Sequence, residues 1–133
     1  KVKSTDFKGK KHVIYFYPKD FTPGCSTQAD EFSTDYKKFQ DKDIEIIGIS
    51  PDDVDSHKKF CEKMGIKYVL LADTEKEVSK AFDVWSMKKF MGREYMGVVR
   101  STFLVNEKGK IFKIYSKVKP KGHAKQVLED FTK

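Results

Sequence analysis

Short apolar runs alternate with amphipathic stretches along this chain, which is the pattern of strands joined by helices. Nearly continuous apolar residues over 12–17 and again over 44–49 indicate two strands that are buried on both faces. Between them, residues 25–39 carry apolar side chains at helical spacing. The first third of the chain therefore predicts a strand, a helix and a second strand parallel to the first.

The remaining pattern continues this order and then changes to neighbouring strands. In chain order it predicts a helix over 54–64 ended by Gly65, a strand over 68–71, a short helix over 75–82, an irregular, partly buried loop over 83–99, a β-hairpin of 102–105 and 111–115, and a closing helix over 122–133. Helical crossovers followed by a hairpin predict an α/β fold with a mixed central β-sheet flanked by helices. We expect residues 1–133 to form a single domain.

The charge of the chain does not identify a nucleic-acid reader. The net charge is +7, but only Arg93 and Arg100 are arginines, and the lysines are interleaved with 20 acidic residues. Base and phosphate readout favours arginine. We interpret the lysines as a solvated surface and expect no nucleic-acid partner, although a basic binding module stays open as the non-enzymatic alternative.

The sequence also gives no sign of a membrane span, a signal peptide or a metal site. No apolar run approaches the ~18 residues of a membrane span, and the first residues lack the apolar core of a signal peptide. The two cysteines do not form a CxxC pair, and the three histidines are scattered. We therefore expect a cytoplasmic protein with no membrane partner, no metal and no other cofactor.

Cys25 is the first candidate for chemistry. It follows the proline- and glycine-containing loop 18–24 and falls in the first turn of the predicted helix. A helix N-terminus carries partial positive charge and unpaired N–H groups, both of which favour the nucleophilic thiolate. The alternative is a small buried side chain without reactivity.

Two residues of the same loop are candidates to assist Cys25. The hydroxyl of Thr22 can donate to a thiolate or to a bound oxygen, or it can simply cap the helix. Pro18 lacks an N–H group and can form one wall of a pocket, or it can simply end the strand.

Two more distant residues complete the candidate site. Arg100 opens the strand that contains 102–105, where its guanidinium can stabilise a thiolate, the alternative being a surface ion pair. Cys61 lies beside the buried stripe of the helix over 54–64. It is either a half-buried spare thiol or a second thiol that attacks an oxidised Cys25, and the latter requires Cα atoms within roughly 7 Å.

These residues together resemble the active-site signature of peroxiredoxins. The motif consists of YFYPKD at 15–20 and TPGC at 22–25, followed at a distance by RSTFL at 100–104. More narrowly, the chain is similar to the bacterioferritin-comigratory-protein, or peroxiredoxin Q, branch, and further matches run through nearly its whole length. The resemblance implies a thioredoxin-like fold and the cysteine-based reduction of hydrogen peroxide and organic hydroperoxides.

Carried over residue by residue, the resemblance implies a role for each candidate. Cys25 would be the peroxidatic cysteine, with Thr22, Arg100 and Pro18 as its pocket partners. The thiolate would attack one peroxide oxygen, and Thr22 and Arg100 would stabilise the charge that develops on the leaving oxygen. Cys25 would become a sulfenic acid, which then condenses with a thiol.

The resolving step follows from a departure from the family pattern. Many members of the branch place the resolving cysteine five residues after the peroxidatic one, but here that position is Asp30. Others carry it on the next helix, where Cys61 falls. The resemblance thus implies an intramolecular Cys25–Cys61 disulfide in a monomer, recycled by thioredoxin or a similar dithiol.

A Cys25–Cys61 disulfide requires the chain to rearrange, and other functions remain possible. Each cysteine starts on its own helix, so we expect local unwinding and mobility around both. The rivals are a one-cysteine peroxidase that uses an external thiol and a thiol–disulfide oxidoreductase, which the missing CxxC pair disfavours. Only six residues precede Phe7, whereas the family has a longer segment there, so a truncated N-terminus is expected.

Overall fold

The protein is described from a computed structural model, which covers residues 10–18, 20–90, 92–116, 118–119 and 121–131. Strands and helices alternate in the first half of the chain, and strands predominate in the second. In order they are β1 Lys11–Phe16, α1 Pro23–Asp41, β2 Ile44–Ser50, α2 Val54–Met64, β3 Val69–Ala72, α3 Glu77–Ala81, β4 Trp85–Phe90, β5 Arg93–Val98, β6 Ser101–Val105, β7 Ile111–Tyr115 and α4 His123–Phe131.

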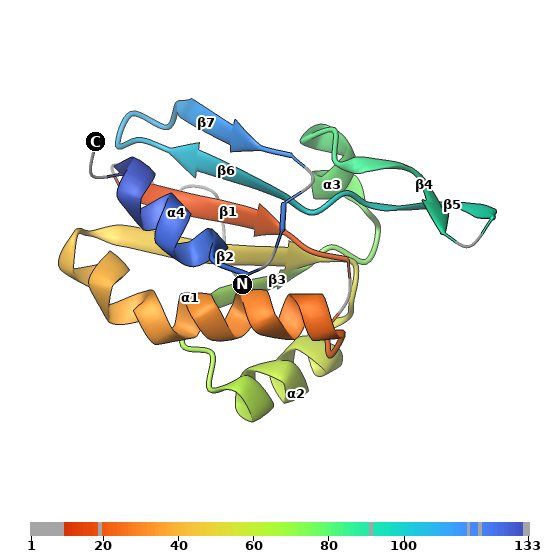
Figure 1. Ribbon diagram of the computed structural model, residues 1–133, viewed down its shortest axis with the longest axis horizontal. Coiled ribbons are helices and arrows are strands. Elements are labelled where there is room, and N and C mark those ends of the chain that lie inside the picture. Colours follow the sequence, from red (N-terminus) through yellow and green to blue (C-terminus); the bar gives the residue numbers. More distant parts are fainter. Residues whose placement is uncertain (1–9, 19, 91, 117, 120, 132–133) are drawn as a thin grey trace.

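Five strands form a mixed sheet in the order β3-β2-β1-β6-β7 (Figure 1). β1 is parallel to β2, with Val13 opposite Ile46, and β2 is parallel to β3. β6 is antiparallel to both of its neighbours, β1 and β7. The predicted α/β fold with a mixed, helix-flanked sheet is confirmed.

Alternation along β1 divides the interior into two apolar clusters. Val13, Tyr15 and Tyr17 face α1, α2 and α4, while Phe16 faces the opposite side with Phe103 and α3. Because successive side chains of a strand point to opposite faces, one apolar run serves both clusters. This double burial explains why β1 is continuously apolar from Val13 to Phe16.

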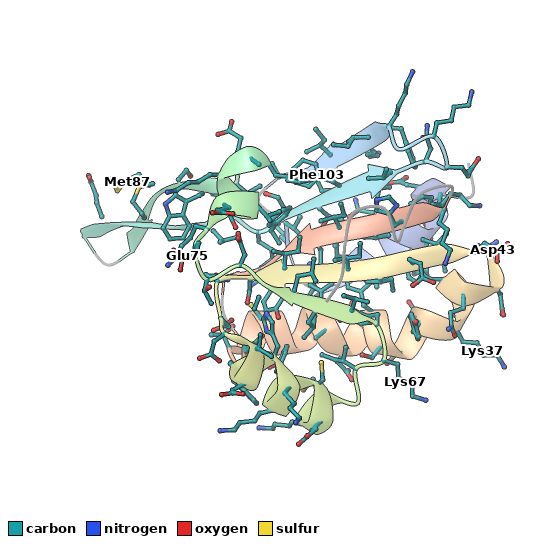
Figure 2. All side chains as sticks on the ribbon, turned by 180° about the vertical axis from the view of Figure 1, so that it is seen from behind. Lys37, Asp43, Lys67, Glu75, Met87 and Phe103 are labelled. Atoms are coloured by element: carbon teal, nitrogen blue, oxygen red, sulfur yellow. The ribbon has the colours of Figure 1, made fainter. Side chains whose placement is uncertain are left out.

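The segment 83–99 corrects the sequence-based prediction, because it is a β-hairpin and not an irregular loop. β4 pairs with β5 in antiparallel register, with Met87 opposite Met96. The hairpin extends away from the main sheet, and Met87 lies on it far from Phe103 (Figure 2). Both methionines are exposed, whereas Trp85 and Val98, which pair at the base of the hairpin, pack against the apolar cluster that contains Phe16.

The other predicted elements agree with the structure to within a few residues. The predicted closing helix over 122–133 is observed from His123 to Phe131, and residues 132–133 lie outside the described part of the chain. The predicted N-terminal segment before residue 10 also lies outside it. In the described part, none of the helices has the length and apolar character needed to cross a membrane.

Gly48 of β2 has no room for a side chain. A Cβ atom there would lie 2.6 Å from Cδ2 of Leu70 and 2.9 Å from Cζ of Tyr15. Tyr15 cannot move aside easily, because it is buried and its hydroxyl lies 2.6 Å from that of Tyr68. Glycine is therefore required by space rather than by backbone conformation.

We predict that Gly48→Ala lowers the free energy of unfolding by about 1–3 kcal/mol, the usual cost of overpacking a core. The measurement is urea denaturation followed by circular dichroism. Ile114→Ala is the control, since this side chain is 60% exposed and its truncation should change stability far less. Equal effects of the two substitutions would contradict the packing argument.

Candidate active site

Cys25 lies in the first turn of α1, at the edge of the sheet where β1 ends. Thr22 is the N-cap residue of the helix, and its carbonyl accepts a hydrogen bond from the N–H of Ser26 at 2.8 Å. The Cys25 side chain is 1% exposed. The sulfur therefore lies at the positive end of the helix dipole, in a buried position.

Arg100 supplies a positive charge directly at this sulfur. Its Nη2 donates a hydrogen bond to Cys25 Sγ at 3.3 Å. The sheet brings the two together, because Phe16 at the end of β1 pairs with Ser101 at the start of β6, and Arg100 immediately precedes β6. The alternative of Arg100 as a surface ion pair does not fit this contact.

Gln28 is a residue of the site that the sequence analysis missed. Its Oε1 accepts a hydrogen bond from Arg100 Nη1 at 2.7 Å, so the guanidinium is held by both Gln28 and Cys25. The side chain is fully buried. The available signal was a polar residue three positions after Cys25, on the same face of an otherwise apolar helix stripe.

The loop before Cys25 contains a residue in a conformation that side chains rarely adopt. Phe21 has φ +66°, in the left-handed region. Such strain persists where the surroundings hold it, and it is common at functional sites. Here the Phe21 ring packs edge-to-face on Phe60 of α2, with centroids 5.1 Å apart.

The remaining predicted residues occupy different parts of the site. Pro18 follows β1 and is half-buried, and the side chain of Thr22 makes no capping hydrogen bond. Cys61 lies on α2, packed against the same apolar cluster that contains Cys25, and both cysteines are free thiols. Burial raises the pKa of Cys61, and the negative charges of Asp20 and Glu62 raise it further.

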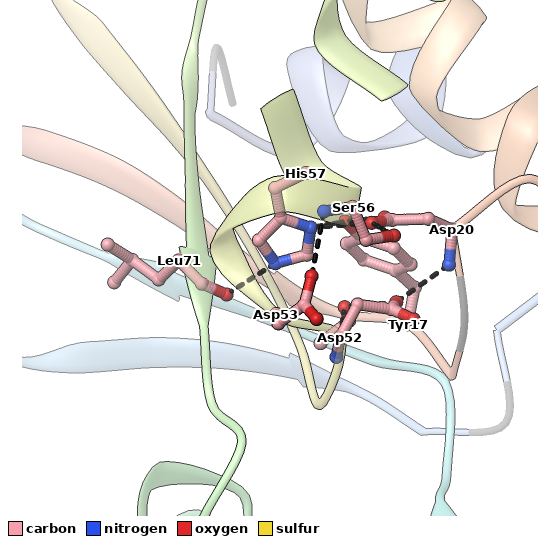
Figure 3. Close-up of polar contacts among 8 residues, drawn as sticks. Tyr17, Asp20, Asp52, Asp53, Ser56, His57 and Leu71 are labelled. Atoms are coloured by element: carbon pink, nitrogen blue, oxygen red, sulfur yellow. Dashed lines mark hydrogen bonds and ion pairs between the residues drawn. The ribbon is translucent and has the colours of Figure 1, made fainter. Parts of the chain in front are cut away.

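A buried polar network joins the Cys25 loop to α2 (Figure 3). We call it the Asp20–His57 network. Asp20 Oδ2 accepts hydrogen bonds from His57 Nδ1 at 2.7 Å and from Ser56 Oγ at 2.8 Å, and Oδ1 accepts from the Tyr17 hydroxyl at 2.6 Å. The Asp20 N–H donates to Asp52 Oδ2 at 2.7 Å. Sequence analysis missed this network.

The hydrogen-bond partners of His57 indicate which of its ring nitrogens carry protons. His57 Nε2 faces the carbonyl oxygen of Leu71 at 3.0 Å, an acceptor, and Nδ1 faces the carboxylate of Asp20. Both ring nitrogens therefore donate, which makes the ring an imidazolium. Burial alone would lower the pKa of His57, but the bond and charge of Asp20 outweigh it and raise that pKa. Likewise, the bonds from His57, Tyr17 and Ser56 outweigh burial and lower the pKa of Asp20.

The same cluster is the one place in the described chain where three metal-ligating side chains gather. Ligand atoms of Asp20, Asp52 and His57 lie within 4.8 Å of one another. Each of these groups already has hydrogen-bond partners, including Ser50 Oγ, which donates to Asp52 Oδ2 at 2.7 Å. We therefore interpret the cluster as a hydrogen-bond network that connects two structural elements.

A second buried histidine, His123, is the first residue of α4. The Nε2 of His123 is 2.8 Å from Thr102 Oγ1, and its Nδ1 is 3.2 Å from Gln126 Oε1. Burial lowers the pKa of His123 to about 4, and the charge of Arg100 adds to this effect against the bond to Gln126. His123 is therefore neutral at pH 7.

Comparison with known proteins agrees with this geometry. Residues 1–114 match the model of the AhpC/TSA family. Peroxiredoxin Bcp of Bacillus subtilis is 48% identical over 128 residues, which are 96% of this chain and 82% of that protein. The chain belongs to the peroxiredoxin family, in its Bcp, or peroxiredoxin Q, branch. It is accordingly a thiol peroxidase.

Solved structures of this branch share the fold over most of their length. The bacterioferritin comigratory protein of Xanthomonas campestris, studied for its alkyl peroxide reduction activity, matches with a TM-score of 0.93 and 38% identity, covering 96% of this chain and 80% of that one. Two cysteine-to-serine mutants of Xanthomonas campestris peroxiredoxin Q each match with a TM-score of 0.91. Their substituted positions, 48 and 84 in that protein, are 36 residues apart, as are Cys25 and Cys61.

The lowered pKa of His123 makes the stability of this peroxiredoxin depend on pH. Because its folded-state pKa of about 4 lies below the ordinary value of 6.5, the unfolded chain binds more protons between these values. Stability should therefore fall as the pH falls from 6.5 to 4, by about 3 kcal/mol from this residue. Urea denaturation at several pH values measures the slope. His123→Gln should make the slope shallower, and an unchanged slope would contradict the assignment.

Proposed function

We propose that Cys25 is the peroxidatic cysteine and that Cys61 resolves it. The observation that supports the first part is the hydrogen bond from Arg100 Nη2 to Cys25 Sγ at a helix N-terminus. A guanidinium and a helix dipole at one sulfur favour its thiolate, which is the form that attacks peroxide. The peroxide class includes hydrogen peroxide and alkyl hydroperoxides, in line with the activity studied in the Xanthomonas relative.

In the first step, the Cys25 sulfur forms a bond to the terminal oxygen of the peroxide while the O–O bond breaks. The leaving alkoxide or hydroxide takes up a proton and departs as alcohol or water. Cys25 is oxidised by two electrons to the sulfenic acid, and the peroxide is reduced by the same two. Arg100 and Thr22 stabilise the charge on the leaving oxygen, and Pro18 limits the access of water.

In the second step, the Cys61 thiolate attacks the sulfur of oxidised Cys25. The new S–S bond replaces the S–O bond, and hydroxide leaves and is protonated to water. A dithiol such as thioredoxin then reduces the disulfide by exchange. The pairing is supported by the shared apolar cluster and by the 36-residue separation seen also in the substituted relative.

This chemistry needs only one copy of the chain, so we propose a monomer. Two free cysteines suit a reducing compartment, which favours the cytoplasm. Residues 1–133 would act as one domain. Light scattering after size exclusion, on reduced and on oxidised protein, tests the monomer directly.

The two cysteines should differ sharply when each is replaced. Cys25→Ser should abolish peroxide consumption in a thioredoxin-coupled assay. Cys61→Ser should consume about one equivalent of peroxide per chain and then stop, leaving an oxidised Cys25 that dimedone traps. Peptide mapping of the oxidised wild type should show a Cys25–Cys61 link. Sustained thioredoxin-supported turnover by Cys61→Ser would favour the one-cysteine alternative.

Thr22 offers a test that separates a catalytic hydroxyl from a helix cap. Thr22→Val keeps the shape but removes the hydroxyl, and we expect the second-order rate constant with hydrogen peroxide to fall roughly 100-fold, the effect of losing one oxyanion donor. Thr22→Ser keeps the hydroxyl and should stay near the wild type. The melting temperatures of both variants are measured alongside the rate constants. A large fall in stability with unchanged kinetics would assign Thr22 to the cap.

A further inference from the structure

The loop that carries Cys25 and the helix that carries Cys61 are joined through one carboxylate oxygen. Asp20, five residues before Cys25, accepts at Oδ2 from both His57 and Ser56, which lie in the first turn of α2. Asp20 is 3% exposed and His57 is 4% exposed. Charged hydrogen bonds are strong when water is excluded, so this junction is a firm attachment.

The bonds from α2 to Asp20 are separate from the interactions that cap the two ends of this helix. The helix is capped at its start by Asp53, whose carboxylate accepts from the N–H of Ser56 at 2.8 Å. It ends at Gly65, which has φ +66° and closes the last turn with a bond to the Cys61 carbonyl. Both caps are made within the helix and its flanking residues. The Asp20–His57 network adds the connection to the Cys25 loop.

Cys61 lies one turn beyond His57 on the same face of α2, because residues four apart are neighbours along a helix. Its position is therefore defined by the turn that Asp20 holds. The charge of Asp20 also contributes to the raised pKa of Cys61, which favours the unreactive thiol in this arrangement. While Asp20 is bonded to α2, Cys61 is therefore held in place and favoured as a thiol.

We propose that the Asp20–His57 network holds α2 against the Cys25 loop while peroxide reacts, and that its release controls how fast Cys61 reaches oxidised Cys25. Asp20, Ser56 and His57 are then positioning residues for the resolving step. This inference rests on the proposed pairing of Cys25 with Cys61. It adds the identity of the interaction that must break before the two sulfurs meet.

The experiment separates oxidation from resolution in single-turnover reactions. Reduced protein is mixed with one equivalent of hydrogen peroxide and quenched with acid and a thiol-alkylating reagent. Intact mass spectrometry then follows the sulfenic and disulfide forms over time. The second-order constant for oxidation and the first-order constant for disulfide formation are obtained from the same samples.

The main variant is His57→Gln, which removes the charged donor to Asp20 and retains an amide N–H for the Leu71 carbonyl. Loss of a hydrogen bond to a charged group should raise the disulfide constant roughly tenfold or more. The oxidation constant should change by less than about threefold. Lys58→Gln is the matched control, because it removes one positive charge from the next, exposed position of α2 and should alter neither constant.

Ser56→Ala distinguishes the two explanations, because they predict opposite changes in the rate of disulfide formation. Alanine favours the helix more than serine does, so a purely structural role would make α2 harder to unwind and slow disulfide formation. Loss of the bond to Asp20 should instead accelerate it by about threefold or more. This variant also keeps the proposal testable if His57→Gln does not fold.

The outcomes distinguish this proposal from the function on which it rests. A wild type that forms no Cys25–Cys61 disulfide would overturn both. A wild type that forms it, with unchanged or slower resolution in Ser56→Ala, would overturn the network proposal alone. The same holds if His57→Gln folds and slows resolution, or changes both constants by the same factor.

Discussion

The structure depends on the pairing of β1 with a parallel strand on one side and an antiparallel strand on the other. This pairing brings the carboxyl ends of β1 and β2 to the same edge as the beginning of β6. The Cys25 loop, Arg100 and the start of α2 therefore meet without any long connection. In open α/β sheets, this edge is where ligands bind, because loops and helix N-termini gather there. A shift of one residue in the β6 register would carry Arg100 away from the sulfur.

Charge is distributed unequally between the two cysteines, although both belong to one apolar cluster. Cys25 has the cation Arg100 as its neighbour, whereas Cys61 lies near the anions Asp20 and Glu62. The anions near Cys61, together with burial, raise its pKa and favour its thiol form. Under the proposed mechanism, this difference would let Cys25 react with peroxide first, and Cys61 would act as a nucleophile only after its surroundings change.

Much of the fold was predictable because each apolar run serves a defined buried face. The strand over 12–17 and the helix over 25–39 followed from periodicity, and the placement of Cys25 at their junction followed from both. The contact of Arg100 with Cys25 needed the family resemblance, since 75 residues separate them. The bond between Asp20 and His57 could not be predicted from local sequence. The two residues are 37 positions apart and come together only because the sheet brings the loop after β1 close to α2. The hairpin at 85–98 was not predicted because side chains beyond its base, such as Met87 and Met96, are exposed, so burial imposes little apolar pattern on its sequence.

The exposed methionines on that hairpin have a consequence for a protein that handles peroxide. Met87 and Met96 face each other across β4 and β5, and they are 58% and 46% exposed. Thioethers are oxidised to sulfoxides, which are polar and can be reduced again by dedicated enzymes. Because neither side chain belongs to the two core clusters, such oxidation would alter the hairpin surface and leave the interior intact. Among the described methionines and cysteines, the most exposed side chain thus lies outside both core clusters.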